Sequence, residues 1–358
     1  MARGPIVMIA DDLTGALDSA APFCAAGLTV GVAVHEEAAA AALAGIHDVI
    51  VINTRSRALS TAAARARIER VCGQLSAVAP RLLFKKIDSR LQGPIAAEIA
   101  AVLAHLGQAR AVLCPAVPDQ GRVVRQGRVM GRGVDAPVAI AERLVGLSGI
   151  EIEDGEDDAD MRRIARRLLE ATDAPLAIGA RGLAQGLAAE LAQADMRSGS
   201  EAKPGLPLLL VIGSRETVTG EQVDALLDRG GTVDCPAPGG HVGQSLPDAP
   251  VLLVRAIDDG VNHEPDALAR RLAAGMAKHI RSRRVATLFL AGGETAQAVL
   301  RALGVDLLEP EGEVLPGVPI CRIPGSDLRI VTKSGSFGDA GALLDIVAAA
   351  APHREVAL

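Results

Sequence analysis

Two adjacent carboxylates end the first apolar run of the chain. The run IVMIA, residues 6–10, is followed directly by Asp11 and Asp12 and then by Leu-Thr-Gly. A carboxylate in this position can cap the next helix, because it accepts hydrogen bonds from the first unpaired N–H groups. We expect Asp11 to be that cap. Asp12 is then available to bind a hydroxyl group and to take its proton.

Three further apolar runs lead into polar segments that mix acids or amides with cations. They are residues 53–57 (NTRSR), 85–93 (KKIDSRLQG) and 115–122 (PAVPDQGR). Open parallel sheets bind ligands beyond the carboxyl ends of their strands, so these segments should converge on one crevice. Carboxylates accept hydroxyl protons, and a guanidinium holds a carboxylate with two hydrogen bonds. The pattern predicts a site for a small polyhydroxylated anion, formed by Asp11, Asp12, Arg57, Lys86, Asp88, Ser89 and Arg122.

Glycine-rich turns follow the apolar runs in the second half of the chain. They are Gly213-Ser214, residues 291–295 (AGGET) and residues 333–339 (KSGSFGD). Such strand-to-helix turns present backbone N–H groups at the positive end of a helix, which suits a phosphate. None of them is a Walker A motif or a GxGxxG fingerprint. The residues predicted to bind phosphates are Ser214, Gly292, Gly293, Glu294, Thr295, Lys333, Gly335 and Gly338.

Each of these segments also has a purely structural interpretation. Asp12 or Thr14, and Asp88 or Ser89, are residue types that cap helices, and arginines at strand ends are commonly solvated. A Gly-Gly pair at a strand end is commonly a plain turn. The argument for binding sites rests on several such segments occurring together in each half.

Short apolar runs alternate with amphipathic Ala- and Leu-rich segments along most of the chain. The pattern predicts parallel strands joined by crossover helices, and thus an α/β fold. Residues 118–135 interrupt it and are expected to form a loop with a hairpin. Thr219 and Gln222 fit a capping box for the helix that follows. The expected strands are residues 5–10, 48–53, 81–87, 109–116, 151–153, 174–180, 208–214, 251–257, 286–293 and 329–335. The expected helices are residues 16–27, 60–75 (with Ser60 as N-cap), 93–107, 158–171, 183–194, 264–284, 295–304 and 339–350.

The length of 358 residues suggests two domains. A segment rich in Gly, Ser, Pro and charge interrupts the periodicity, and we take residues 198–206 as the linker. Residues 1–197 are then an N-terminal domain and residues 207–358 a C-terminal domain. We expect each to be a mostly parallel sheet flanked by helices, with the ligand cleft between them.

Composition excludes several classes of partner. Aromatic residues make up 1% of the chain and the net charge is −6, which argues against nucleic-acid binding. No apolar run reaches the roughly 18 residues of a membrane helix, so we expect a cytoplasmic protein without a membrane partner. The five cysteines and seven histidines show no metal-ligand spacing. We predict no metal site in the chain and, where it self-associates, a homodimer.

The motifs in their order resemble those of the four-carbon acid sugar kinase family, long catalogued as a family of unknown function. The matching stretches are ADDLTGALD (10–18), NTRSRAL (53–59), KKIDSRLQG (85–93), PAVPDQGR (115–122), DADM (158–161) with IGARGLAQGLA (178–188), VIGSRETVT (211–219), AGGETAQAVLRALG (291–304) and TKSGSFGD (332–339). The resemblance is collinear from about residue 5 to 345. It departs at Gln92, where the family usually carries Arg, and in the region 134–150, which is shorter here than in typical members.

The resemblance implies an enzyme that uses ATP to phosphorylate threonate, erythronate or 3-oxo-tetronate. The N-terminal domain would bind the sugar acid through Asp12, Arg57, Asp88 and Ser89. The C-terminal domain would bind ATP through Ser214, Gly292 to Thr295 and Gly335, with Mg²⁺ bridging the phosphates. Asp12 is the expected general base and Asp88 the second choice. Lys86 or Arg57 would hold the acid's carboxylate or the developing charge.

Rival functions remain open on the sequence alone. A haloacid-dehalogenase-type phosphatase needs DxDx[TV], which neither Asp11 nor Asp12 begins. The Ca²⁺ site of a nucleoside hydrolase needs a longer acidic cluster. The main alternative is a non-catalytic protein of the same fold that binds a sugar acid or a nucleotide.

Overall fold

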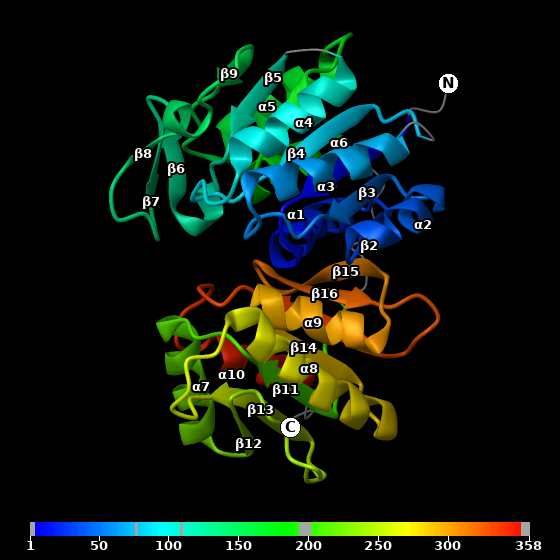
Figure 1. Cartoon of the computed structure of the whole chain (residues 1–358), viewed down its shortest axis with the longest axis vertical. Helices are drawn as coiled ribbons and strands as arrows, with labels where there is room; N and C mark the ends of the chain where they lie inside the picture. The colour runs from blue at the N-terminus through cyan, green and yellow to red at the C-terminus, as the bar shows by residue number, and fades with distance from the viewer. Residues whose placement is uncertain (1–3, 76–77, 108–109, 193–201, 352–358) are drawn as a thin grey trace, which may run out of the picture. The chain divides into compact units, whose positions relative to one another are not determined.

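The computed structural model describes residues 4–75, 78–107, 110–192 and 202–351. The chain divides into two compact units, residues 1–199 and 200–358. In each unit, helices cover a sheet that is mostly parallel, so the predicted α/β class is confirmed (Figure 1). The predicted linker, residues 198–206, lies partly outside the described residues.

The sheet of the first unit is parallel throughout its described strands. Their order is β2-β3-β1-β4-β10-β5-β9, which places the first strand of the chain near the middle. The bounds are β1 (Ile6–Ala10), β2 (Val30–Ala33), β3 (Val49–Asn53), β4 (Leu82–Lys86), β5 (Ala111–Cys114), β9 (Ile150–Ile152) and β10 (Leu176–Gly179). Nearly all of these residues are buried, because helices cover both faces of the sheet.

The helices of the first unit lie in two layers. α1 and α5 pack against α6 on one face, and α3 packs against α4 on the other (Figure 1). Ser60 caps α3 as predicted, by accepting a hydrogen bond from the Ala63 N–H at 3.4 Å. The bounds are α1 (Leu13–Ala25), α2 (Ala39–Ala44), α3 (Thr61–Gln74), α4 (Ile95–Leu106), α5 (Asp158–Glu170) and α6 (Arg181–Leu191).

The register of the central strands determines which polar segments become neighbours. β1 lies between β3 and β4, and its last residue, Ala10, pairs with Asn53 on one side and Lys86 on the other. The three segments that follow these strands therefore leave the sheet side by side at one edge. β5 is separated from β4 by β10, so the segment after β5 starts two strands away.

The predicted hairpin within residues 118–135 is present. β6 (Arg122–Arg125) and β7 (Arg128–Gly131) form an antiparallel pair, and β8 (Val138–Ala139) adds a short third strand. Gly131 allows a close approach here, since a Cβ at this residue would lie 2.1 Å from the Gly121 carbonyl oxygen. The end of β7 therefore packs against Gly121, the residue that precedes β6.

The sheet of the second unit is parallel except at one edge. Its order is β12-β13-β11-β14-β17-β16-β15, and among the described strands only the pairs β17–β16 and β16–β15 are antiparallel. The bounds are β11 (Leu208–Ile212), β12 (Val233–Pro238), β13 (Val251–Ile257), β14 (Thr287–Ala291), β15 (Leu307–Leu315), β16 (Val318–Arg322) and β17 (Arg329–Lys333). β11, β14 and β17, which precede the glycine-rich turns, are adjacent.

Two helices cover each face of this second sheet. α8 (Pro265–Ser282) packs against α9 (Gly293–Leu303), and α7 (Thr217–Arg229) packs against α10 (Ala342–Ala350). The core beneath α7 and α10 is aliphatic except for Phe289. The capping box predicted at Thr219 and Gln222 is wrong, because α7 begins at Thr217 with Glu216 as its N-cap. Both residues are buried within the helix and bind another segment.

Several elements escaped the sequence pattern: β2, α2, β12 and the β15–β16 pair. β2 has four residues, and β15 carries charged residues and irregular pairing, so neither gives a clear apolar run. Among the described residues, no helix combines the length and apolarity needed to span a bilayer.

Candidate active site

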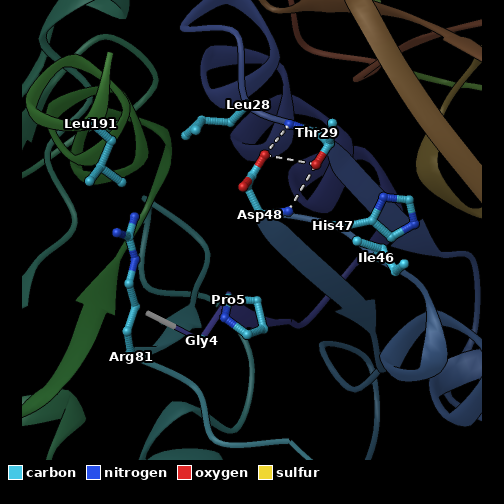
Figure 2. A pocket seen from close by; sticks show the side chains of 9 residues that line it. All are labelled: Gly4, Pro5, Leu28, Thr29, Ile46, His47, Asp48, Arg81 and Leu191. Atoms are coloured by element: carbon cyan, nitrogen blue, oxygen red, sulfur yellow. Dashed lines mark hydrogen bonds between the residues drawn. The ribbon is translucent and has the colours of Figure 1, made fainter. Parts of the chain in front are cut away.

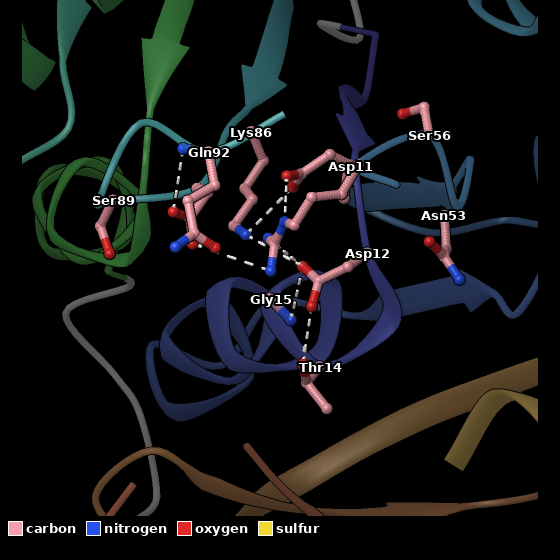
Figure 3. Close-up of polar contacts among 12 residues, drawn as sticks. Asp11, Asp12, Thr14, Gly15, Asn53, Ser56, Lys86, Ser89 and Gln92 are labelled. Carbon is pink, nitrogen blue, oxygen red and sulfur yellow. Dashed lines mark hydrogen bonds and ion pairs between the residues drawn. The ribbon is translucent and has the colours of Figure 1, made fainter. Parts of the chain in front are cut away.

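Two cations hold the acid pair at the end of β1. Arg57 donates from Nε to Asp11 Oδ2 at 2.7 Å and from Nη2 to Asp12 Oδ1 at 2.6 Å. Lys86 Nζ lies 3.3 Å from an oxygen of each carboxylate. Figure 3 shows Asp11, Asp12 and Lys86 directed toward one another. The structure thus joins the segments after β1, β3 and β4 in one network of ion pairs.

Asp12, and not Asp11, is the helix cap. The Asp12 backbone is extended, and its Oδ1 accepts a hydrogen bond from the Gly15 N–H at 3.2 Å while Oδ2 accepts one from the Thr14 hydroxyl at 2.7 Å. The expectation that Asp11 caps α1 is therefore wrong. The Asp11 side chain is buried instead beside Arg57 and Lys86, with which it forms ion pairs.

All four charges of this network are stable at neutral pH. Burial alone would raise the pKa of the Asp11 carboxyl, but the charges of Lys86 and Arg57 outweigh it and lower that pKa. The same two cations lower the pKa of Asp12 against its burial. In return the acids raise the pKa of Lys86, which burial alone would lower. Asp11 and Asp12 are carboxylates, and much of the charge of Arg57 and Lys86 is already neutralised.

Asp88 extends the network through the third segment. Its Oδ2 accepts hydrogen bonds from the backbone N–H groups of Arg90 at 3.1 Å and Gln92 at 3.2 Å. Its Oδ1 lies 3.7 Å from Arg57 Nη1. Leu91, between the two donors, has a positive φ of 61°, so Asp88 fixes a tight turn as well as facing a cation.

Ser89 and Arg122 meet beside Asp88. Arg122 Nη1 donates to Ser89 Oγ at 2.6 Å, and its Nε and Nη2 donate to the carbonyl of Arg132 at 3.1 and 2.9 Å. The fourth predicted segment therefore reaches the third through the first residue of β6. All seven predicted anion-binding residues lie at the carboxyl edge of the first sheet.

Some polar residues of the second segment do not join the site. Asn53 donates to the Val34 carbonyl at 2.7 Å, and Thr54 donates to the Ala10 carbonyl at 2.7 Å. Ser56 shares a hydrogen bond with Thr54. All three are fully buried, and in Figure 3 Asn53 and Ser56 lie apart from the acid pair. They fix the turn from which Arg57 reaches back.

Arg181, at the start of α6, was not among the predicted site residues. It is buried and donates to Asp18 Oδ1 on α1 at 2.8 Å and to Asp119 Oδ2 at 3.1 Å. A Cβ on Gly182 would lie 2.3 Å from the Ala116 carbonyl oxygen, so the helix start is in close contact with this loop. Arg181 thereby holds the loop from which Arg122 extends. A lone arginine at a helix start carries no sequence signal for this role.

The predicted phosphate-binding turns of the second unit also come together. A Cβ on Gly292 would lie 3.4 Å from the Ser214 backbone N, and one on Gly335 would lie 2.2 Å from Ser214 Oγ. Gly292 has a φ of 96° and caps α9 without a side chain, so the first N–H groups of that helix have no side-chain cap. Glu294 and Thr295 belong to that first turn, where Thr295 is buried and Glu294 is exposed.

Buried side chains shape the turn after β17. Thr219 donates to the Gly335 carbonyl at 2.6 Å, and Gln222 donates to the Phe337 and Asp339 carbonyls at 2.9 and 2.8 Å. Lys333 Nζ also donates to the Phe337 carbonyl, at 3.0 Å, and burial lowers the pKa of Lys333 to about 8. With its carbonyls thus engaged, the turn from Gly335 to Gly338 has a fixed shape.

Comparison with known proteins identifies two families of domain along the chain. The model of a sugar-binding N-terminal domain matches residues 6–142, and that of a nucleotide-binding C-terminal domain matches residues 247–343. A D-threonate kinase of Bordetella bronchiseptica is 30% identical, with 95% of this chain and 96% of the relative aligned. The chain belongs to the four-carbon acid sugar kinase family.

Other members of the four-carbon acid sugar kinase family align over similar lengths. A 3-oxo-tetronate kinase of Methylobacterium radiotolerans is 30% identical over 95% of this chain and 98% of the relative. A solved structure from Salmonella typhimurium LT2 has a TM-score of 0.73 at 19% identity, covering 95% of this chain and 98% of that one, and shows the shared fold. The alignment with the Bordetella kinase runs over 400 positions, so that relative has residues that this chain, at 358, lacks.

A pocket of about 390 Å³ lies at the other edge of the first sheet (Figure 2). Its lining includes Pro5 and Arg81, which precede β1 and β4, so it opens at the amino ends of the strands. Thr29 and Asp48 in its wall bind each other through both side chains and backbone. None of the predicted site residues lines this pocket. The predicted site residues lie instead at the carboxyl ends of the strands, which is where open parallel sheets ordinarily bind ligands.

Proposed function

We propose that this chain is an ATP-dependent kinase that phosphorylates a hydroxyl group of a small sugar acid, most simply a four-carbon one. The observation that carries the proposal is the state of Asp12. It is ionised, it is held in place by Arg57 and Lys86, and its Oδ2 receives only the Thr14 hydroxyl among the described side chains. A carboxylate oxygen with a remaining lone pair can accept the hydrogen bond of a substrate hydroxyl.

Asp12 is the proposed acceptor of the proton from the attacking hydroxyl. Phosphoryl transfer has a loose transition state, in which the nucleophile must be oriented more than it must be deprotonated early. A carboxylate with a lowered pKa is therefore adequate for the role. Asp88 is the second candidate, because within the described part of the chain its Oδ1 faces only Arg57, at 3.7 Å.

The second unit is the proposed site of ATP. The N–H groups at the start of α9 and the turn after β17 would surround the phosphates, with Ser214 between them. A Cβ on Gly335 would collide with Ser214 Oγ, and the φ of 96° at Gly292 disfavours any side chain, which fits a cradle formed by backbone. The residues proposed to bind ATP are Ser214, Gly292, Gly293, Glu294, Thr295, Lys333, Gly335 and Gly338.

Mg²⁺ would reach the site with the nucleotide. Among the described residues, no group of three or more His, Cys, Asp or Glu side chains is arranged to hold a metal. Mg²⁺ is commonly bound by substrate phosphates and water with few protein carboxylates, so this donor set fits a metal carried by ATP. Its chemistry is to neutralise charge on the phosphates.

The test is a screen for ADP release with Mg²⁺ and ATP against a panel of short-chain sugar acids that includes D-threonate, D-erythronate and 3-oxo-tetronate. We expect ADP release that depends on one of these acids. Isothermal titration with Mg²⁺ and ADP runs in parallel. Failure to bind ADP would refute the kinase proposal. Binding of acid and nucleotide without turnover would identify the non-catalytic binding protein instead.

A further inference from the structure

Three arginines gather beside Ser89, on the side of the site away from the acid pair. Arg122 binds Ser89 Oγ and the Arg132 carbonyl, as described above. A Cβ on Gly133 would lie 3.4 Å from Arg122 Nη2 and 4.0 Å from Arg90 Cδ. The side chains of Arg90 and Arg122 and the turn that carries Arg132 therefore meet at one place.

This cluster has positive charge that the described residues do not neutralise. Neither the Arg90 nor the Arg132 guanidinium has a hydrogen bond or an ion pair within residues 4–75, 78–107, 110–192 and 202–351. The pKa of Arg122 is lowered by burial and by the charges of Arg90 and Arg132, against the opposite effect of Asp88. Like charges held together in a partly buried place favour the binding of an anion.

The two cations nearer Asp12, Arg57 and Lys86, are neutralised by carboxylates. Arg57 faces Asp11, Asp12 and Asp88, and Lys86 faces the first two. Three carboxylates against two cations leave no positive charge for another anion. The sequence suggested Lys86 or Arg57 as the partner of the substrate carboxylate, but the unneutralised charge of this edge lies at the arginine cluster.

We infer that Arg90, Arg122 and Arg132 bind the carboxylate of the sugar acid and so make the enzyme select acids. The inference rests on the proposed function and adds the orientation of the substrate. Ser89 follows Asp88, whose carboxylate faces the same Arg57 that binds Asp12. An acid anchored on the arginines therefore extends its hydroxyl groups along Asp88 toward Asp12. Guanidinium groups suit this role because each binds a carboxylate with two parallel hydrogen bonds.

The test compares Arg90→Gln, Arg132→Gln and the double variant with the wild-type chain. Arg122 is left intact because it also holds the hairpin. Each hydrogen bond to a charged group is worth roughly a 10-fold change in affinity. We expect each single variant to raise the KM for D-threonate or D-erythronate, whichever is the better substrate, about 10-fold, and the double variant to raise it about 100-fold. The KM for ATP stays unchanged, and the kcat falls less than threefold.

Arg128→Gln is the matched control. Arg128 lies on the same hairpin at its opposite end, is exposed, and has no ion pair within the described residues. Its loss removes the same charge and should leave the KM for the acid within twofold. An equal increase of the KM for the acid in Arg128→Gln would show that any loss of positive charge on the hairpin weakens acid binding, and would overturn the inference. A rise in the KM for ATP instead of that for the acid would assign the cluster to a phosphate and overturn it as well.

Calorimetric titration of D-threonate and D-erythronate without nucleotide separates this inference from the proposed function. Acid binding that weakens in the double variant, in a chain that never releases ADP, would refute the kinase and support the carboxylate site. A working kinase whose double variant keeps its KM for the acid would refute the carboxylate site alone. Absence of acid binding to the wild-type chain at millimolar concentration would also refute it.

Discussion

Lys86 reaches the acid pair across Gly15, where a Cβ would lie 1.9 Å from its Nζ. The same Cβ would lie 2.4 Å from Asp12 Oδ1. Gly15 is inside helix α1, where alanine is ordinarily the better residue by about 1 kcal/mol. We infer that glycine is needed at position 15 because the absence of a Cβ leaves space for the ion pairs of Lys86 with Asp11 and Asp12.

Gly15→Ala should impair activity more than stability. The methyl group displaces the Lys86 amine, which is the far end of a flexible side chain, and the gain in helix propensity offsets part of the cost. We expect kcat/KM for the acid to fall about 10- to 100-fold, as for the loss of a charge-assisted hydrogen bond. The thermal midpoint should change by only a few degrees.

The matched control is Gly73→Ala in helix α3. A Cβ there would have no heavy atom within 4 Å, so the substitution tests helix propensity alone. It should leave kcat/KM unchanged. Equal activity in both alanine variants would show that the geometry of the Lys86 ion pair is not needed for turnover.

Asp12→Asn separates the charge of Asp12 from its role as a helix cap. Asparagine caps helices about as well as aspartate, so α1 keeps its start. The variant loses the proposed proton acceptor, and we expect kcat to fall about 10²- to 10⁴-fold. The measurement is steady-state ADP release together with calorimetric affinities for acid and ADP. Full turnover with unchanged affinities would eliminate Asp12 as the base.

Asp157→Asn gives the comparison that this experiment needs. Asp157 caps α5 by accepting a hydrogen bond from the Asp160 N–H at 2.9 Å. The Asp157→Asn variant also replaces a capping aspartate with asparagine, but at a helix start outside the proposed site. Its kcat should match that of the wild-type chain.

The sequence predicted which polar segments lie together at the end of the first sheet, but not which contacts each residue makes there. Buried parallel strands give continuous apolar runs, so the segments after β1, β3 and β4 could be assigned to one edge from the order of residues alone. The sequence could not show that Asp12 rather than Asp11 caps α1, because both are residue types that cap helices and only the backbone at the helix start distinguishes them. Arg90 and Arg132 are 42 positions apart in the numbering, and only the return of the hairpin brings them near each other.

The elements that were missed share a physical reason. β15 pairs with β16 through irregular register, and its Glu311 forms an ion pair with Arg329 of β17. A strand that carries charged residues along its length lacks the apolar run that marks the central strands. The capping box at Thr219 failed similarly, since its side chain binds the Gly335 carbonyl and the pattern of residue types cannot show that contact.

Gly335→Ala should weaken ATP binding selectively. The added Cβ would lie 2.2 Å from Ser214 Oγ and 2.9 Å from Glu216 Cγ, so two of the proposed phosphate-binding turns must separate. Overpacking of this kind costs about 1–3 kcal/mol, and we expect the KM for ATP to rise at least 5-fold with the KM for the acid unchanged. Gly220→Ala, in helix α7 with no heavy atom within 4 Å of its Cβ, is the control. An unchanged KM for ATP in Gly335→Ala would argue against phosphate binding at this turn.

Lys333 should make ATP binding depend on pH. Burial lowers its pKa to about 8, so the amine is charged below that pH and neutral above it. If the charge helps to hold the phosphates, the KM for ATP rises as the pH passes about 8, and the KM for the acid does not follow. Because the folded pKa lies below the unfolded value of roughly 10.4, this group makes the fold more stable, not less, as the pH rises between the two. A loss of affinity in that range is then not caused by unfolding through Lys333.

The check is a series of ATP titrations from pH 7 to 9.5 on the wild-type chain, Lys333→Met and Lys278→Met. Lys333→Met should have a high KM for ATP at every pH, with no inflection near 8. Lys278 is exposed on α8, and its variant should keep the wild-type profile. A wild-type KM for ATP that stays flat across the range would mean that the charge of Lys333 does not bind ATP. Lys333 would then only support the turn after β17, through its hydrogen bonds to the Ser334 and Phe337 carbonyls. A neutral amine can donate these hydrogen bonds as well.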